Sequence, residues 1–213
     1  MDALLEAITE QAPSKREQQK EARRNAIIDA GFQEFALQGF TATKLDDVAV
    51  RAGIGKGTIY LYFDSKESLF EEVVRKNLFP ARDEALDHAA EFQGTATELL
   101  TIHFQRMYEI LYRDQMPELF ALIMGEASRF PKIGDFFFKE IVRTNQELLQ
   151  GIIRKGIESG EFRESAIKDF TQILIAPAMI SALWRLQFDT YSPLDIDAYS
   201  ATHLEFVLRG LKA

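Results

Sequence analysis

Residues 56–66 carry the side-chain types that a protein needs to hold DNA. Ammonium groups and hydroxyls bind phosphate oxygens, while small residues let a backbone approach the edges of bases. Lys56 and Lys66 frame the stretch, and the small or hydroxylated residues between them are Gly57, Thr58, Tyr60 and Tyr62. On a short helix, these groups would lie beside a positive N-terminus that also attracts phosphate. The chemistry predicts a helix that contacts double-stranded DNA.

A helix-turn-helix over residues 45–62 would position those side chains. Two helices cross closely only where the contact residue is small, and Ala49 occupies that place. Gly53 lies where a short turn needs a left-handed backbone conformation. The small core between the helices would be filled by Val48, Ile54 and Ile59. An ordinary helical hairpin could show the same five residues, so this pattern alone leaves both interpretations open.

The longer segment GFTATKLDDVAVRAGIGKGTIYLYFDSKESLF, which begins at Gly39, resembles the N-terminal DNA-binding signature of the TetR family. The resemblance covers about residues 24–74, and chance is a poor explanation for so many matches in order. The matching residues are Gly39, Thr41, Thr43, Val48, Ala49, Ala52, Gly53, Lys56, Gly57, Thr58, Ile59, Tyr60, Phe63, Ser65, Lys66, Glu67 and Leu69. The resemblance implies an all-α homodimer with an N-terminal three-helix DNA-binding domain and a larger C-terminal helical domain that binds a ligand and dimerises.

The resemblance also implies roles for single residues. Thr43 would cap the second helix near a phosphate. The start of the third helix, residues 56–58, would approach bases. Tyr60, Tyr62 and Lys66 would meet the DNA backbone or adjacent bases.

Two residues depart from the family pattern. Lys44 stands where a second threonine is usual, and it adds a potential phosphate contact. Gly55 stands where a serine usually caps the recognition helix. Without that hydroxyl, the backbone amides at the start of the helix must hold a phosphate alone.

Capping signals and apolar spacing predict a chain that is helical throughout. An S-x-x-E capping box at Ser14 opens the first helix, and Pro80 predicts a kink or break in the fourth. Asp64 or Ser65 would cap that fourth helix, which continues past Leu78. The other helices are expected over residues 14–38, 43–52, 56–62, 96–112, 118–129, 133–159, 166–188 and 196–211. We divide the chain into a flexible tail (1–13), a helix-turn-helix domain (14–66) and an effector-binding and dimerisation domain (67–213).

The charge distribution favours a DNA-facing N-terminal part. The formal net charge is −8, but residues 14–66 alone carry +2 and the remainder −10. An acidic body would be repelled by phosphates, so specificity must come from the motif. The absence of cysteine suits a cytoplasmic protein, and we expect neither an export signal nor a membrane span.

Aromatic and aliphatic residues of the C-terminal part could line an apolar ligand pocket with a few polar contacts. The candidates are His103, Phe104, Met107, Leu111, Phe120, Ile123, Met124, Phe138, Ile141, Asn145 and Trp184. Phe137 is a further apolar candidate, and Glu126 or Arg129 a further polar one. Residues of these types at helical spacing are more often plain core, and that alternative stays open for each of them.

Residues 166–188 are apolar on nearly all sides of the predicted helix, so both of its faces need a cover. One face would pack on its own domain. The other would pack against a second subunit, together with Leu204, Phe206, Val207 and Leu211 of the last helix. A buried helix in a monomer is the alternative.

Enzyme chemistry fits this sequence poorly. The three histidines, His88, His103 and His203, are scattered, and metal-spaced clusters or nucleophile elbows are missing. Gly53, Gly55 and Gly57 follow a predicted helix rather than a strand, which argues against a dinucleotide site. We therefore expect no catalytic residue, metal or cofactor. The favoured function is a repressor released from a palindromic operator by a small, largely apolar effector, and the rival is a similar DNA-binding protein controlled by a protein partner.

Overall fold

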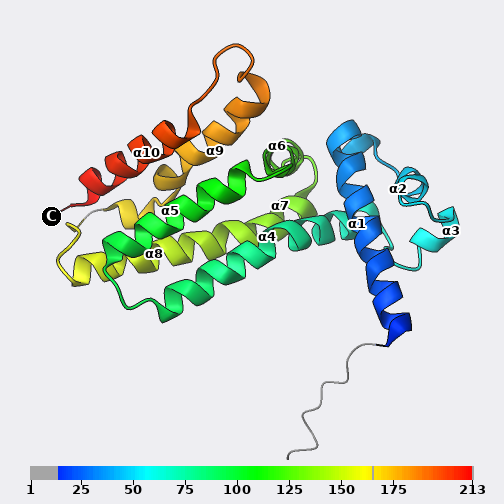
Figure 1. Cartoon of the computed structure of the whole chain (residues 1–213), viewed down its shortest axis with the longest axis horizontal. Coiled ribbons are helices and arrows are strands. Elements are labelled where there is room, and N and C mark those ends of the chain that lie inside the picture. Colours follow the sequence, from blue (N-terminus) through cyan, green and yellow to red (C-terminus); the bar gives the residue numbers. More distant parts are fainter. Residues whose placement is uncertain (1–13, 165, 213) are drawn as a thin grey trace, which may run out of the picture.

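The computed structural model describes residues 14–164 and 166–212, and the regular structure of these residues is helical apart from an isolated β-bridge between Phe162 and Lys212. The N-terminal helices are α1 (Lys15–Ala42), α2 (Leu45–Arg51), α3 (Lys56–Ile59) and α4 (Lys66–Glu91). The C-terminal elements are α5 (Ala96–Tyr112), α6 (Met116–Glu126), α7 (Pro131–Phe137), the π-helical segment η3 (Phe138–Val142), α8 (Arg143–Glu158), the 3-10 turn η4 (Ala166–Asp169), α9 (Gln172–Gln187) and α10 (Ile196–Leu211). Figure 1 shows α1–α3 grouped at one end, with α4 running from that group into the larger bundle.

The first helix begins at the predicted capping box. The backbone N–H of Ser14 donates to the Glu17 carboxylate at 2.8 Å, and the Glu17 N–H donates back to the Ser14 hydroxyl at 3.3 Å. The helix runs four residues further than predicted, but Gly39 interrupts it with a φ of 75°. That left-handed conformation suits glycine, so the predicted end is present as a kink.

The helix-turn-helix core forms as predicted. Val48, Ala49 and Ile59 are fully buried between the helices, and Gly53 makes the turn with a φ of 66°. The third helix is shorter than expected, because α3 ends at Ile59 and the chain continues to residue 62 as turns.

The predicted capping role of Thr43 is wrong. Lys44 occupies the N-cap position of α2, and among the described residues no side chain caps that helix. Thr43 is instead buried, with its hydroxyl donating to the carbonyl oxygens of Glu34 and Gly39 at 3.2 and 2.8 Å. It therefore fastens the end of α1.

Ser65 rather than Asp64 caps α4, in a reciprocal pair of hydrogen bonds with Ser68. The helix continues through Pro80 to Glu91, so of the predicted kink or break the break does not occur, and a kink stays a prediction. Proline lacks an N–H and normally costs an internal helix one hydrogen bond, which the helix tolerates at this exposed position.

The predicted bounds of α5 and α10 are confirmed. The expected helix over residues 133–159 is divided by η3, and the one over 166–188 begins as η4 before α9. The helix expected over residues 118–129 is α6, which starts two residues earlier, because Pro117 suits the first turn of a helix, and ends at Glu126.

Two apolar cores hold the molecule together. The first joins α1–α4 with α6 and α7, and the second joins α5 with α8, α9 and α10. Aromatic rings link the N-terminal helices to the C-terminal part within the first core: Phe40 lies 5.4 Å from Phe70 and 4.6 Å from Phe130 between ring centroids. The division of the chain at residue 66 stays a prediction, and this core extends across it.

Candidate DNA-binding surface and ligand cavity

The start of α3 presents its polar side chains to solvent. Lys56 and Tyr60 are both more than half exposed. The Asp46 carboxylate of α2 accepts hydrogen bonds from the Lys56 ammonium at 3.0 Å and from the Tyr60 hydroxyl at 3.4 Å. The hydrogen bond from Lys56 to Asp46 raises the pKa of the lysine, which keeps it charged. Asp46, which the sequence did not suggest for this surface, thus orients two candidate DNA contacts.

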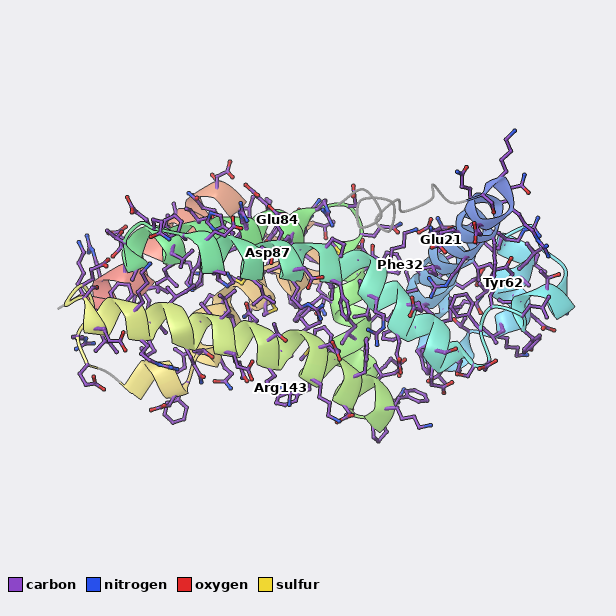
Figure 2. All side chains as sticks on the ribbon, turned by 90° about the horizontal axis from the view of Figure 1, so that it is seen from below. Glu21, Phe32, Tyr62, Glu84, Asp87 and Arg143 are labelled. Atoms are coloured by element: carbon purple, nitrogen blue, oxygen red, sulfur yellow. The ribbon has the colours of Figure 1, made fainter. Side chains whose placement is uncertain are left out.

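The glycines of this surface leave room for a partner. A Cβ on Gly57 would meet nothing within 4 Å, so packing inside the described protein does not require glycine there. Gly55 is the N-cap of α3, and it provides no side chain to the cap. Two further candidates lie on the same part of the molecule: Lys44 is exposed and Thr58 is half-buried. Figure 2, which shows the molecule from below with α4 running across the view, places Tyr62 at this end of the molecule, far from Glu84.

Lys66 has partners inside the protein. Its ammonium donates to the carbonyl oxygens of Phe40, Thr41 and Thr43 at 2.8, 3.0 and 3.4 Å, and it lies 4.6 Å from the centroid of the Phe40 ring. These contacts tie the start of α4 to the end of α1. A contact between Lys66 and phosphate stays a prediction.

Glu34 of α1 connects the first helix to the helix-turn-helix, and this role was not predicted from the sequence. Its side chain is buried and accepts hydrogen bonds from Gln38 and, at 2.6 Å, from Arg51 at the end of α2. An acidic residue on the buried face of an amphipathic helix was the available signal, because a buried carboxylate needs a partner.

A cavity of about 870 Å³ lies between α4, α5, α6, η3, α8 and α9. Most of its wall is apolar, as the sequence predicted. The predicted residues that line it are His103, Met107, Leu111, Phe120, Met124, Ile141 and Asn145, together with Phe137. These residues come from α5, α6, α7, η3 and α8, and the fold brings them together.

Four predicted residues lie outside the cavity wall. Phe104 is buried and packs against the ring of His203, because it follows His103 and points to another side of α5. Ile123 is fully buried in the first core. Phe138 and Trp184 are partly exposed on the outer surface. Apolar type alone could not separate the faces of these helices.

The polar candidates Glu126 and Arg129 also lie outside the wall. Glu126 has one buried carboxylate oxygen with no hydrogen-bond partner among the described residues, near Gly39. Arg129 is exposed. The two residues belong to the region where α6 meets the DNA-binding helices.

The structure adds charged residues to the wall that the sequence did not suggest. They are Arg82, Glu84, Arg106, Glu109 and Arg113. The Arg106 guanidinium lies 3.2 Å from the Glu84 carboxylate, which joins α5 to α4. The spacing of Arg106 and His103, one helical turn apart, was the signal that could have found the arginine.

His103 is uncharged in this wall. Burial lowers its pKa to about 4, against the opposing effect of a hydrogen bond with Asn145. Its Nε2 atom is buried and has no hydrogen-bond partner among the described residues. The cavity therefore contains an imidazole nitrogen that is free to bond a ligand.

Helices α9 and α10 carry an apolar outer surface. Ile173, Ile180 and Phe206 are 62%, 56% and 77% exposed. Val207 and Leu211, which we expected at a subunit contact, are buried within their own chain and lie in the second core. The exposed apolar side chains Ile173, Ile180 and Phe206 are therefore the candidates for a subunit contact.

The described residues include no helix that is long and apolar enough to cross a membrane. Within the same residues, no three acidic or histidine side chains gather where they could hold a metal ion.

Comparison with known families identifies both halves of the chain. Residues 27–73 match the family described as bacterial regulatory proteins, tetR family, and residues 98–207 match the AefR-like transcriptional repressor, C-terminal domain. The second match alone covers more than half of the chain. These families consist of DNA-binding regulators rather than enzymes.

Similar proteins agree with these matches over their full length. An uncharacterised HTH-type transcriptional regulator of Bacillus subtilis, YhgD, is 29% identical, with 90% of this chain and 97% of that protein covered. The HTH-type transcriptional repressor KstR2 of Rhodococcus jostii is 27% identical, with coverage of 90% and 92%. The crystal structure of FadR from B. subtilis in complex with stearoyl-CoA shares the fold, with a TM-score of 0.68, 22% identity and coverage of 88% and 98%. The chain belongs to the TetR family of DNA-binding transcriptional regulators.

Proposed function

We propose that the protein represses transcription as a homodimer on a palindromic operator and that a small, largely apolar effector releases it. The course of α4 is the observation that carries this proposal. Residues 69–74 of α4 pack in the core beside the helix-turn-helix, and residues 78–86 border the cavity. A molecule in the cavity therefore touches the helix on which the DNA-binding helices are mounted.

The size of the cavity favours a small molecule over a protein partner as the regulator. Ligand pockets usually measure about 300–1,000 Å³ and are mostly apolar, and the cavity of about 870 Å³ falls in this class. A regulator controlled only by a protein partner needs no such space. The stearoyl-CoA held by FadR and the repressor KstR2 support the same proposal by similarity.

An anchor between α4 and η3 would pass the effector signal on. Arg82 of α4 donates from Nη1 to the carbonyl oxygen and to the carboxylate of Glu140, each at 3.2 Å. A π-helical turn disturbs the regular hydrogen-bond ladder, so its carbonyl oxygens are available to such donors. Ile141 and Val142, next in the chain, line the cavity. A ligand that moves η3 would thus tilt α4, and a useful effector needs a coupling of about 1–3 kcal/mol.

On DNA, each subunit would place α3 in one major groove, with the two α3 helices about 34–36 Å apart. Lys44, Tyr60 and Tyr62 would contact the backbone, and Lys56, Gly57 and Thr58 would approach bases. The pairing of subunits would use the outward side chains of α9 and α10, which include Ile173, Ile180 and Phe206. An isologous contact of this kind gives the two-fold symmetry that a palindromic site requires.

Selection of bound duplexes from a random pool, followed by affinity measurements on the recovered sequence, tests the proposal. We expect an inverted repeat. The double variant Lys56→Ala, Tyr60→Ala should lose at least about tenfold in affinity for the recovered sequence, because it removes two candidate DNA contacts, one of them positively charged. Thr58→Ala should instead change the preferred bases.

Arg154→Ala is the control, since it removes one exposed positive charge on α8, away from α3. It should leave the affinity within about twofold of the wild type, as surface charges outside an interface contribute little. Unchanged affinity in the double variant would show that α3 is not the DNA-contacting surface.

A further inference from the structure

Two nitrogen atoms on one face of α5 are buried in the cavity wall without a hydrogen bond to the described residues. Nε2 of His103 has no partner among them, whereas Nη1 of Arg106 makes an ion pair with the Glu84 carboxylate at 3.2 Å but no hydrogen bond. The two residues are one helical turn apart, so their side chains lie on the same side of the helix. A buried polar atom without a partner costs free energy, and a native protein tolerates this mainly where a ligand or water supplies the bond.

The positive charges near these two nitrogen atoms are paired with acidic residues, and the imidazole is uncharged. Burial lowers the pKa of His103 to about 4, so the imidazole is uncharged near neutral pH. The Arg106 charge faces the Glu84 carboxylate at 3.2 Å. Arg82 of the same wall is paired with Asp83 and Glu140.

Arg113 is the arginine of the wall for which the described residues offer no such pairing. It directly follows the end of α5, ten residues after His103, or about 15 Å away at the rise of an α-helix. A ligand carboxylate at His103 would therefore be buried beside positive charges that acidic residues of the protein already neutralise. Burial of such a carboxylate is costly.

We propose that the effector presents a neutral oxygen, a carbonyl or a hydroxyl, to His103 and Arg106 and fills the rest of the cavity with hydrocarbon. The proposal rests on the function proposed above and names the chemical class of its effector. Arg106 can donate to a carbonyl oxygen. Neutral imidazole offers a donor in one tautomer and an acceptor in the other, and Asn145 can pair with either by presenting its NH₂ or its oxygen.

The hydrocarbon part of the effector would contact side chains that surround the two nitrogens on several helices. These are Met107, Ile110, Phe120, Leu148, Ile175 and Met179. Each additional buried CH₂ group of the ligand should raise its affinity by about fourfold, which makes a long or multi-ring body favourable. The neutral oxygen then fixes the orientation of this body.

Two kinds of molecule offer this chemistry. One is a free neutral lipid, such as an ester, ketone or alcohol. The other is an acyl thioester whose charged carrier stays outside the cavity while its carbonyl meets His103. Both place the same uncharged oxygen against the same nitrogens.

Displacement of the neutral fluorescent dye N-phenyl-1-naphthylamine from the full-length protein tests the class. The competitors are methyl decanoate, decan-1-ol and decanoate, near neutral pH. We expect the ester and the alcohol to bind at least about tenfold more tightly than the carboxylate, because the loss of hydration costs a charged carboxylate far more than a neutral oxygen. Tighter binding of decanoate would overturn the proposal and assign an anion to Arg106.

S-decanoyl coenzyme A separates the two sources. Affinity more than about tenfold above that of methyl decanoate would identify the thioester, because the carrier then adds contacts outside the cavity. Affinity equal to that of the methyl ester would identify a free neutral lipid. Either result retains the neutral oxygen.

Variants of His103 show whether that residue holds the oxygen. His103→Leu should lower the affinity for methyl decanoate by about fivefold to tenfold, the usual effect of losing one hydrogen bond. His103→Gln keeps a hydrogen-bonding group and should recover most of the loss. The control is His88→Leu, a half-buried histidine on α4 that does not line the cavity.

Wild-type affinity of His103→Leu for the ester would overturn the assignment. Failure of the proposed function would give another result. The dye would then bind equally to the wild type and to Ile110→Trp, a variant that fills the cavity. That outcome would show that the cavity takes no ligand, whereas loss of dye binding in Ile110→Trp confirms the site and leaves the oxygen chemistry to the competitors.

Discussion

Phe206→Glu should prevent formation of the proposed dimer. Phe206 is 77% exposed on α10, and a phenylalanine side chain offers about 200 Å² of surface. Covering that exposed part stabilises the contact by about 3–4 kcal/mol per copy at about 25 cal/mol per Å². In a two-fold symmetric contact, both subunits contribute Phe206, so the loss counts twice. The variant would also bury a carboxylate from each subunit. Even half of this total raises the dimer dissociation constant by about a thousandfold.

Sedimentation over a range of micromolar concentrations measures that constant, and fluorescence anisotropy measures operator affinity on the same samples. Leu37→Glu is the matched control, because Leu37 is 69% exposed on α1, away from α9 and α10. It should sediment as the wild type does. A wild-type dissociation constant for Phe206→Glu would place the subunit contact elsewhere, and monomers with full operator affinity would remove the need for a dimer.

Three further changes test other parts of the structure. His103→Leu should leave the unfolding temperature of the free protein nearly unchanged, because removal of the buried Nε2, which has no hydrogen-bond partner among the described residues, offsets the loss of the hydrogen bond with Asn145; a loss of several degrees would indicate a structural histidine. Lys66→Met should lower the unfolding temperature through loss of its bonds to the end of α1, and the salt dependence of operator binding should fall by about 1 in slope only if Lys66 also meets a phosphate. Burial opposes ionisation of Glu161, but hydrogen bonds from Thr97 and Ala96 lower its pKa to about 2, so it stabilises the fold above its unfolded pKa of about 4.5. Glu161→Gln should therefore destabilise the protein at neutral pH, and the difference should shrink as the pH falls from 4.5 toward 2; a constant difference would contradict the assignment.

Local signals in the sequence predicted the elements whose ends depend on short-range chemistry. The capping box at Ser14 and the left-handed turn at Gly53 each involve a few neighbouring residues, so the sequence contains the whole cause. Likewise, α5 has its own capping box at Thr95 and begins where expected. Thr43 shows the limit of this reasoning, because its hydroxyl bonds backwards to α1 instead of forwards to α2.

Longer-range features could not be predicted in the same way. Which apolar residues face the cavity depends on how five helices are rotated against each other, and a step of one residue turns a side chain by about 100°. Phe104 and His103 differ by that single step, and only the histidine lines the cavity. The π-helical segment has no sequence signature that we recognise, and the pairing of Arg82 with Glu140 joins residues 58 positions apart.

The continuous first core limits how the two ends of the molecule can communicate. Helix α6 turns Phe120 and Met124 toward the cavity and packs Leu119 and Ile123 into the core that it shares with α1 and α4. A close-packed interior resists compression, so a ligand that displaces α6 must move it as a rigid body against those helices. The Phe40 ring, in contact with Phe130 just beyond α6, would receive that motion at the base of the helix-turn-helix. The effector signal would thus have two parallel routes, through α6 and through Arg82 on α4, and removing either contact alone should weaken induction without abolishing it.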